Sequence, residues 1–412
     1  MTQCNTHSYA GSKVYCGFDV HKNSWSVCVR VNGIQADAYR MDASVDKVVA
    51  KLKTDYPDAE FHSVYEAGFS GFSAHRRLVE AGFHNIVVNP ADVPTSGRER
   101  AFKSDDVDCR KLAKHLESGD LHGIDIPSED LEKMRSLVRR ETQLRDAATR
   151  CNNQLRGSLL FHGRHEVPDR LGSRAVEKLR AAAEKEQDEE TLSLVRELVF
   201  LREERQRVIK AEKELQRKLG YETAVGNLAT IPGIAWRSAT ILQAELGDIG
   251  RFPTRNQLAS YVGVAPHLNG SGDKEKATAS GSRKKRQLHY LLVQAAWVAA
   301  MKDNSIRAYY CRLCRGRTRT RAIVGVAKKL LMLVNAVLRT GRPYDGEKLR
   351  KAHPELEEKI RKLEGCAEKP DAVLEKAVVV PEEAGLPCEE DILAEYGEDF
   401  VCDGSSRMVD QL

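Results

Sequence analysis

Residues 14–41 read VYCGFDVHKNSWSVCVRVNGIQADAYRM. Apolar, β-branched and aromatic residues dominate 14–20 and 25–31, and a third extended segment covers 35–41. Between the second and third segments stands Asn32-Gly33, a dipeptide that accepts the positive φ angles of a tight hairpin turn. The stretch therefore predicts three consecutive strands.

The segments that follow alternate between helical and strand-like patterns. We expect a helix over 44–54, a strand over 61–65, a helix over 70–81, a strand over 85–88 and a helix over 104–118. Three strands followed by alternating helices and strands is the order of a ribonuclease-H-like (RuvC-like) α/β domain. We place this domain at residues 13–125.

Two acids open the last of these helices. Residues 103–110 read KSDDVDCR, in which Ser104 can cap the helix. Asp105 and Asp108 are three apart and share one helix face, whereas the competing Asp106 points elsewhere. Like charges held this close repel each other unless a cation lies between them.

Two further acids, Asp19 and Glu66, stand at or near the ends of strand-like runs. Together with Asp105 and Asp108 they make four carboxylates on separate elements. Such a set can hold two Mg²⁺ ions about 3.5–4 Å apart for in-line phosphoryl transfer. The alternative is that each acid is only a helix cap or a surface charge.

Residues 126–222 are rich in Arg, Glu, Leu and Lys and poor in Gly and Pro over long spans. Helical spacing over 131–161 and 191–219 predicts two long antiparallel helices, a coiled-coil arm, with a charged connector near 183–190. Such an arm is typical of oligomerisation or scaffolding. Its arginines leave a nucleic-acid face open as an alternative: Arg135, Arg139, Arg140, Arg145, Arg150 and Arg156.

A second compact, mostly helical domain is predicted over 223–342. It begins with Leu228-Ala-Thr-Ile-Pro-Gly-Ile-Ala, where a Pro-Gly turn between two apolar helical segments resembles a helix-hairpin-helix. That element binds a phosphate backbone through the free amides of a helix N-terminus. Apolar helices are also expected over 288–300 and 322–338.

Within this domain, Asn269-Gly-Ser-Gly-Asp-Lys places Ser271 between two glycines, which let the backbone approach a ligand closely. A serine in such a loop can attack a phosphodiester, although a Gly-Ser-Gly loop is more often only a turn. Five arginines fall within 312–321, which we expect to be a positive loop. The residues assigned to nucleic-acid binding are Lys274, Lys276, Arg283, Lys284, Lys285, Arg286, Arg312, Arg315, Arg317, Arg319 and Arg321.

Charge is unevenly distributed along the chain. The formal net charge is +5, but the segment from Glu355 to the C-terminus holds 17 acidic and 6 basic residues, a net charge of −11, and the remainder therefore carries +16. A basic body suits a polyanionic partner. We expect residues 343–412 to form a charged, largely disordered tail.

Cysteine usage and hydropathy bear on the compartment. The ten cysteines show no framework spacing, and Cys311-x-x-Cys314 is a lone pair that gives only a weak signal for zinc. The chain has no signal peptide and no uncharged apolar run of the roughly 18 residues that a membrane span needs. These features predict a protein of a reducing cytoplasm.

Several motifs together resemble one family, the IS one-ten (IS110) insertion-sequence transposases, whose members recombine DNA under the direction of a bridge RNA. The resemblance covers about residues 13–340. Its matching pieces are Gly-Phe-Asp-Val-His-Lys with Asp19, Tyr-Glu-Ala-Gly with Glu66, Lys-Ser-Asp-Asp-Val-Asp-Cys-Arg with Asp105 and Asp108, then Ile-Pro-Gly-Ile, Ala-Glu-Leu-Gly-Asp-Ile-Gly-Arg-Phe and Leu-Ala-Ser-Tyr-Val-Gly-Val-Ala-Pro.

The resemblance implies a RuvC-like domain with an Asp-Glu-Asp-Asp metal site and a C-terminal domain with a nucleophilic serine. Counted from Pro266, that serine corresponds to Ser271, with Ser280 and Ser282 as lesser candidates. The family usually has Ser-Gly-Gly at this point, and Asp273 replaces the second glycine here. The acids would bind Mg²⁺ and the serine would attack phosphorus, leaving a covalent serine–DNA phosphoester.

The resemblance also implies partners. These are donor and target DNA, a bridge RNA and further copies of the chain, from a dimer to a dimer of dimers on DNA, in a prokaryotic cytoplasm. Two alternatives stay open. One is a RuvC-like junction-resolving nuclease that cuts with activated water, and the other is a non-enzymatic nucleic-acid-binding protein.

Overall fold

The computed structural model describes residues 8–94, 105–164, 171–265, 267–270, 275–278 and 285–347. The side chains of residues 105, 106, 267–270 and 275–278 are not among those described. The chain divides into two compact units, residues 1–126 and 127–412. The predicted tail over 343–412 lies almost entirely outside the described residues.

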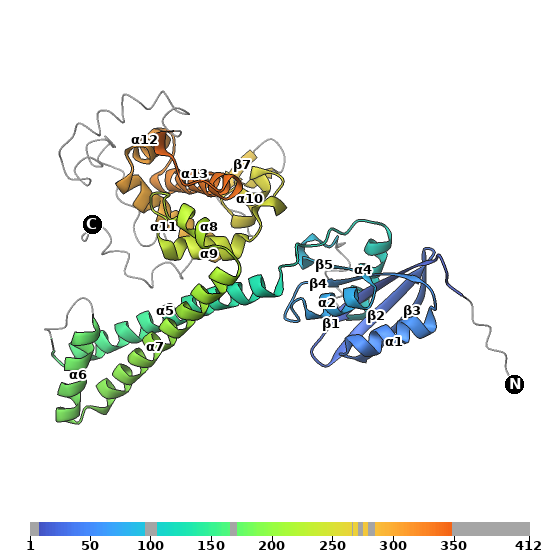
Figure 1. The fold of residues 1–412 in the computed structure, drawn as a ribbon, viewed down its shortest axis with the longest axis horizontal. Coiled ribbons are helices and arrows are strands. Elements are labelled where there is room, and N and C mark those ends of the chain that lie inside the picture. The colour runs from blue at the N-terminus through green and yellow to red at the C-terminus, as the bar shows by residue number, and fades with distance from the viewer. Residues whose placement is uncertain are drawn as a thin grey trace. The chain divides into compact units, whose positions relative to one another are not determined.

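The first unit is a five-stranded mixed sheet with helices on both faces (Figure 1). Its strand order is β3-β2-β1-β4-β5; β1 pairs antiparallel with β2 and parallel with β4. This is the ribonuclease-H-like α/β arrangement that the sequence predicts. The elements are β1 (Lys13–Val20), β2 (Ser24–Val31), β3 (Ile34–Asp42), α1 (Val45–Asp55), β4 (Glu60–Glu66), α2 (Ser73–Glu80), β5 (His84–Val88), the 3₁₀ turn η1 (Pro90–Asp92) and α4 (Asp105–Glu117).

The hairpin turn between β2 and β3 has the predicted chemistry. Asn32 and Gly33 take φ angles of 52° and 80°, the left-handed conformation that this dipeptide adopts at low cost. On one sheet face, α1 and α2 bury a core that includes Phe18, Leu52 and Leu78. The other face is covered by α4.

The second unit begins with a pair of long antiparallel helices, α5 and α7, which lie side by side in Figure 1. Both were predicted. The connector expected near 183–190 is wrong in part, because residues up to Glu186 belong to a further helix, and the chain turns only at Gln187 with φ 57°. The elements are α5 (Glu129–Phe161), α6 (Ser173–Glu186) and α7 (Glu189–Lys218).

The rest of the second unit is mostly helical, with one two-stranded hairpin. The elements are α8 (Glu222–Leu228), α9 (Trp236–Leu246), η2 (Ile249–Arg251), α10 (Arg255–Val262), β6 (His267–Gly270), β7 (Glu275–Thr278), α11 (Arg286–Lys302), α12 (Asn304–Cys314) and α13 (Arg319–Thr340). In the described part of the chain, no helix combines the length and apolar character of a membrane span.

A turn joins α8 to α9, as the Pro-Gly pattern predicts. Gly233 in this turn has φ 82°, and a Cβ added to it would overlap the carbonyl oxygen of Ala295 and lie 2.9 Å from the amide nitrogen of Ala299. The turn therefore packs directly on the backbone of α11, and only glycine fits there. Identifying the pair as a phosphate-binding helix-hairpin-helix remains a prediction.

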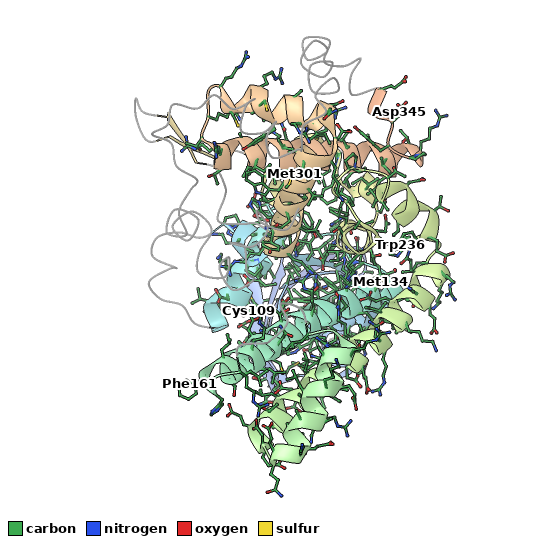
Figure 2. All side chains as sticks on the ribbon, turned by 90° about the vertical axis from the view of Figure 1, so that its left-hand side faces the viewer. Cys109, Met134, Phe161, Trp236, Met301 and Asp345 are labelled. Carbon is green, nitrogen blue, oxygen red and sulfur yellow. The ribbon has the colours of Figure 1, made fainter. Side chains whose placement is uncertain are left out.

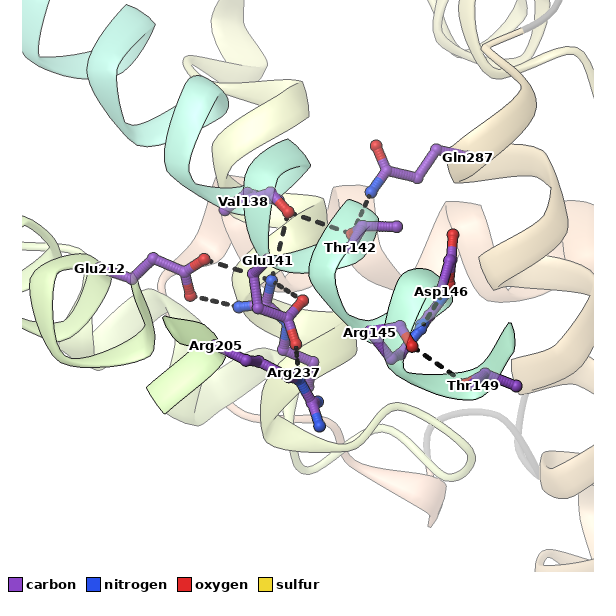
Figure 3. A network of polar contacts seen from close by, with 10 residues as sticks. All are labelled: Val138, Glu141, Thr142, Arg145, Asp146, Thr149, Arg205, Glu212, Arg237 and Gln287. Carbon is purple, nitrogen blue, oxygen red and sulfur yellow. Dashed lines mark hydrogen bonds and ion pairs between the residues drawn. The ribbon is translucent and has the colours of Figure 1, made fainter. Parts of the chain in front are cut away.

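A buried ionic network joins α5, α7 and α9 (Figure 3). The guanidinium of Arg237 on α9 donates hydrogen bonds to Glu141 on α5 and Glu212 on α7, and Arg205 donates to Glu141 at 2.8 Å. The side chains of Glu141 and Glu212 are only 1% and 3% exposed. Arg237 therefore neutralises two carboxylates that water cannot reach.

We expect Arg237→Met to lower the free energy of unfolding by about 3–5 kcal/mol, because it leaves buried Glu212 without a cation and Glu141 with Arg205 alone. Burial raises the pKa of Glu212, and Arg237 opposes that rise. In the variant the pKa rises further, so the folded state holds more protons than the unfolded state, and stability falls as pH increases. Urea unfolding at about pH 5 and about pH 8 should show the larger loss at the higher pH.

The matched control is Arg207→Met. Arg207 on α7 pairs with Glu203 and Glu204, but its side chain is 68% exposed. An exposed pair contributes at most about 1 kcal/mol. Equal losses for the two substitutions would contradict the role assigned to Arg237.

Candidate active site

Two of the predicted acids lie at the ends of neighbouring parallel strands. The printed register of β1 and β4 pairs Gly17 with Val64 and Phe18 with Tyr65, so the next step along both strands brings Asp19 beside Glu66. Residues opposite each other in parallel strands point to the same face. Asp19 and Glu66 therefore share the face that carries Gly17 and is covered by α4.

Close packing at Gly17 holds α4 against that face. A Cβ added to Gly17 would overlap the carbonyl oxygen of Cys109 and lie 2.5 Å from the amide nitrogen of Ala113. Cys109, labelled in Figure 2, is 2% exposed and packs on Cys28 of β2. Only glycine at position 17 lets the helix backbone come this near to β1.

The direction of α4 is fixed at its other end. Glu117 accepts hydrogen bonds from Arg30 Nε at 2.6 Å and from the backbone nitrogen of Gly33 at 2.7 Å. Gly33 lies two residues after Val31, which pairs with Val14 near the start of β1. The C-terminal end of α4 thus lies at the start of β1, and its N-terminal end lies toward Asp19.

This direction brings the acids of α4 toward those of the strands. Asp108 lies one turn before Leu112, which packs on Val64 of β4. Asp105 occupies the position one turn before buried Cys109, whereas Asp106 lies one turn before exposed Arg110. The backbone positions therefore favour the pair Asp105 and Asp108 over Asp106.

The ends of β1, β4 and α4 come together, but Asp19, Glu66 and Asp108, whose side chains are described, do not by themselves form a metal-binding group. No cluster of three or more His, Cys, Asp or Glu side chains able to hold a metal is found in the described part, which leaves out the side chains of Asp105 and Asp106. The N-terminal end of α4 carries a partial positive charge from the helix dipole, which stabilises carboxylates near it. Oxygen ligands of this kind suit Mg²⁺.

One contact at this edge was not predicted. His21 Nε2 lies 3.0 Å from Asp19 Oδ2, and the Asp19 side chain is 22% exposed. The spacing of two residues puts both side chains on the same side of an extended chain. The signal was present in Gly-Phe-Asp-Val-His, but a histidine two residues after an acid is too common to identify from sequence alone.

The predicted nucleophile belongs to the second unit. β6 and β7 pair antiparallel, with Gly270 opposite Glu275, and residues 271–274 connect them. Ser271 lies outside the described residues, as do Asp273, Ser280 and Ser282. Of the predicted phosphate-binding residues, Lys274, Arg283 and Lys284 also lie outside, and the side chain of Lys276 is not described.

The positive loop expected over 312–321 is wrong in its extent. Arg312 belongs to α12 and so is not part of a loop, and α13 already begins at Arg319. The connection is short, with Arg315 and Arg317 in it. Thr318 ends the connection by capping α13, because its hydroxyl accepts a hydrogen bond from the backbone nitrogen of Arg321.

Two cations lie over the ring of Tyr309, and we call these residues the Tyr309 cluster: Tyr309, Arg312 and Lys329. Arg312 lies 5.0 Å and Lys329 Nζ 6.0 Å from the centre of the Tyr309 ring. Burial lowers the pKa of Lys329, and the charges of Arg312 and Arg255 lower it further. Cations held together around an aromatic ring suit a polyanion with flat bases.

Tyr261 is the centre of a second group. Arg251 stacks 4.7 Å from its ring centre, and Lys285 Nζ lies 5.6 Å from it. By contrast, two of the α5 arginines considered for a nucleic-acid face make contacts within the protein. Arg135 donates to the carbonyl oxygens of Ala244 and Glu245, and Arg139 pairs with the Glu245 carboxylate. Their guanidinium groups tie α5 to α9.

Comparison with known proteins gives matches over both units. Residues 16–162 match a family model for the DEDD transposases of the IS110 type, described as "Transposase", and residues 225–311 match the model described as "Transposase IS116/IS110/IS902 family". The first match takes in Asp19, Glu66, Asp105 and Asp108. A DEDD transposase domain implies dependence on a divalent metal ion.

Individual relatives are similar over parts of the chain. A protein of Sinorhizobium fredii, y4qE, which is a transposase by name, is 26% identical over 69% of this chain and 71% of its own length. The transposase of insertion element IS1111A from Coxiella burnetii is 23% identical over 66% and 75%. The pilin gene-inverting protein of Moraxella lacunata is 30% identical over 31% and 40%.

One family model covers most of the first unit and the start of the second, the other covers residues 225–311 of the second unit, and the relatives are transposases or a gene-inverting protein by name. On these grounds the chain belongs to the IS110 family of transposases, enzymes that cleave and transfer DNA strands.

Proposed function

We propose that this transposase cuts and rejoins the DNA of an insertion sequence by serine attack on phosphorus, with two Mg²⁺ ions bound by Asp19, Glu66, Asp105 and Asp108 and a bridge RNA selecting the sites. The observation that supports it most is the meeting of β1, β4 and the N-terminal end of α4 at one edge of the sheet. Because the chain is a transposase, the non-enzymatic alternative falls away.

The donor set at this edge fits a hard divalent cation. The β1–β4 register supports placing Asp19 beside Glu66, the contact of α4 with Gly17 supports placing Asp108 near them, and all four acids supply carboxylate oxygen. Bound Mg²⁺ supplies stabilisation of the charge that develops on the phosphate. In this proposal His21 orients Asp19 through its 3.0 Å contact.

Ser271 supplies the nucleophile in this proposal. Its hydroxyl oxygen forms the bond to phosphorus, the P–O bond to the leaving strand breaks, and that strand departs as a free hydroxyl after taking up a proton. The covalent link keeps the cleavage reversible, so the second strand can be joined by the same chemistry in reverse. A water-activated nuclease would leave no such link.

The basic side chains of the second unit contribute backbone contacts. The Tyr309 cluster and the Tyr261 group place cations beside aromatic rings, where they can contact phosphates. If an RNA reads the sequence by pairing, protein contacts of this kind suffice. The proposal includes assembly of two to four copies on DNA.

A denaturing gel tests the proposal. Purified protein is mixed with Mg²⁺, end-labelled DNA spanning the joined ends of the element, and RNA transcribed from its flanks. We expect a labelled band at the combined mass of the protein and one DNA strand. This band should disappear when a chelator removes Mg²⁺. Peptide mapping should place the covalent link between Asn269 and Lys274. Cleaved DNA without an adduct would instead support the water-activated nuclease.

A test of the geometry follows from Gly17. We expect Gly17→Ala to lower the free energy of unfolding by about 1–3 kcal/mol, because its methyl group must push α4 away from β1. Cleavage should fall more than the loss of folded protein explains, since the shift separates Asp108 from Asp19. Thermal melts and the gel assay on the same sample measure both.

The matched control is Gly82→Ala. Gly82 also lies in the first unit, and a Cβ there meets nothing within 4 Å, although its φ of 89° carries a backbone cost of its own. Gly82→Ala should therefore lose stability while each folded molecule cleaves normally. If Gly17→Ala behaves in the same way, α4 does not position the acids as we infer.

A further inference from the structure

A cavity of about 370 Å³ opens on the second unit where α7 ends and α8 and α9 begin. Its volume is within the range of ligand pockets. None of its lining residues is assigned a role in the proposed function. Its lining residues are Lys213, Gln216, Arg217, Glu222 and Trp236.

Trp236, labelled in Figure 2, gives the cavity an aromatic wall. The residue is 48% exposed although it opens α9 inside a well-packed unit. One edge of its ring faces α8, where a Cβ on Gly226 would lie 4.0 Å from Cζ3. Within the described part of the chain no other ring and no cation stacks on the indole, so a flat ligand can do so.

Polar groups around the ring are also available. Gln216 is 3% exposed, yet its side-chain Nε2 has no hydrogen-bond partner among the described residues. A buried donor without a partner costs about 1–3 kcal/mol, which a ligand or water can recover. Ala235, the N-cap residue of α9, offers no side-chain cap, so backbone amides in the first turn also lack a side-chain partner.

Two cations complete the lining. Lys213 makes no ion pair with any residue that the structure describes. Arg217 contacts Glu222 at 3.6 Å, but both side chains are more than half exposed, so the pair is weak and the guanidinium can turn to another anion. Lys213 and Arg217 are four residues apart on α7 and therefore share a face.

We propose that this cavity binds one unpaired nucleotide, with its base stacked on Trp236 and its phosphate held by Lys213 and Arg217. An aromatic platform beside cations and an unused amide donor is the chemistry that recognises single-stranded nucleic acid. Duplex bases are already stacked on both sides and cannot reach the indole. The proposal rests on the proposed function only in taking nucleic acid as the ligand.

Fluorescence of the full-length protein tests it. Trp25 is 5% exposed and Trp297 is packed against the core, so Trp236 is the tryptophan that an added base can quench. The probes are one eight-nucleotide sequence as single-stranded DNA, as single-stranded RNA and as a DNA duplex. We expect saturable quenching by a single strand and little by the duplex; the DNA and RNA arms show which source binds more tightly.

Variants separate the pocket from general binding. We expect Trp236→Ala to weaken single-strand binding by about tenfold or more, measured with a 2-aminopurine base in the probe, and Trp236→Phe to keep most of it. Phe200→Ala, which removes an aromatic residue that is 57% exposed on α7, should change nothing. Lys213→Ala should weaken binding and make it less dependent on salt concentration, by the amount expected for the loss of about one phosphate contact. Lys210→Ala, one turn away on α7, should change neither quantity.

Each outcome decides one question. Single-strand affinity unchanged in both Trp236→Ala and Lys213→Ala would overturn the pocket, and a covalent DNA adduct in the same preparation would leave the proposed function standing. Specific quenching without any adduct would support the pocket and count against the serine mechanism. Equal quenching by duplex and single strand would also overturn the pocket.

Discussion

Ser271→Ala is expected to abolish the covalent protein–DNA adduct and to lower strand cleavage by at least about a thousandfold. The substitution removes one oxygen atom, and no other hydroxyl group in 271–274 can take its place. Removing the nucleophile of a covalent mechanism typically costs several powers of ten in rate. The change is small and lies in the connection between β6 and β7, so thermal melts should match the wild type.

The controls are Ser280→Ala and Ser282→Ala, which lie after β7. Both should form the adduct at the wild-type level, measured as labelled protein on a denaturing gel. An adduct that survives Ser271→Ala but disappears in either of these variants would move the nucleophile to that serine. Cleavage that survives all three substitutions would favour activated water.

The sequence predicted the first unit well because its signals are local. Alternating apolar residues mark β1 and β2, and Asn32-Gly33 sets a turn whose φ angles the structure shows as positive. The family resemblance then pointed to the transposases, as the comparisons confirm for the family. The roles of individual acids and of Ser271 stay predictions.

Long-range packing could not be predicted in the same way. From the sequence, Gly17 in Cys-Gly-Phe only indicates a weak position in a strand. Glycine is needed there because the backbone of α4, almost 100 residues later in the chain, packs against it in the folded protein. The roles of Arg135 and Arg139 likewise depend on where α9 packs. Charge alone could not separate them from a nucleic-acid face.

The second unit shows the same limit for clusters. Arg312 and Lys329 come from two different helices, and only their meeting at the ring of Tyr309 distinguishes them from other surface cations. The sequence placed Arg312 in a loop because five arginines within ten residues resemble one. In the fold, that segment is divided between two helices whose other faces are apolar.

Asp108→Asn is expected to lower cleavage and adduct formation by at least about a thousandfold. The change removes one negative charge and keeps the size of the side chain. Several kcal/mol of stabilisation of the developing phosphate charge depend on a complete metal site, and each 1.36 kcal/mol corresponds to a factor of ten in rate. Cleavage of labelled DNA at saturating protein measures the change.

The metal role of Asp108 has a readout that does not depend on cleavage. The proposed site holds Asp19, Glu66 and Asp108 close enough to repel one another when no metal is bound, so Mg²⁺ should raise the melting temperature of the wild type. Asp108→Asn should melt at or above the wild-type temperature in a chelator and respond little to Mg²⁺. Asp46→Asn, which changes an acid that is 77% exposed on α1, should behave as the wild type in both conditions. An unchanged response to Mg²⁺ in Asp108→Asn would mean that this carboxylate is not a ligand, however large its effect on cleavage.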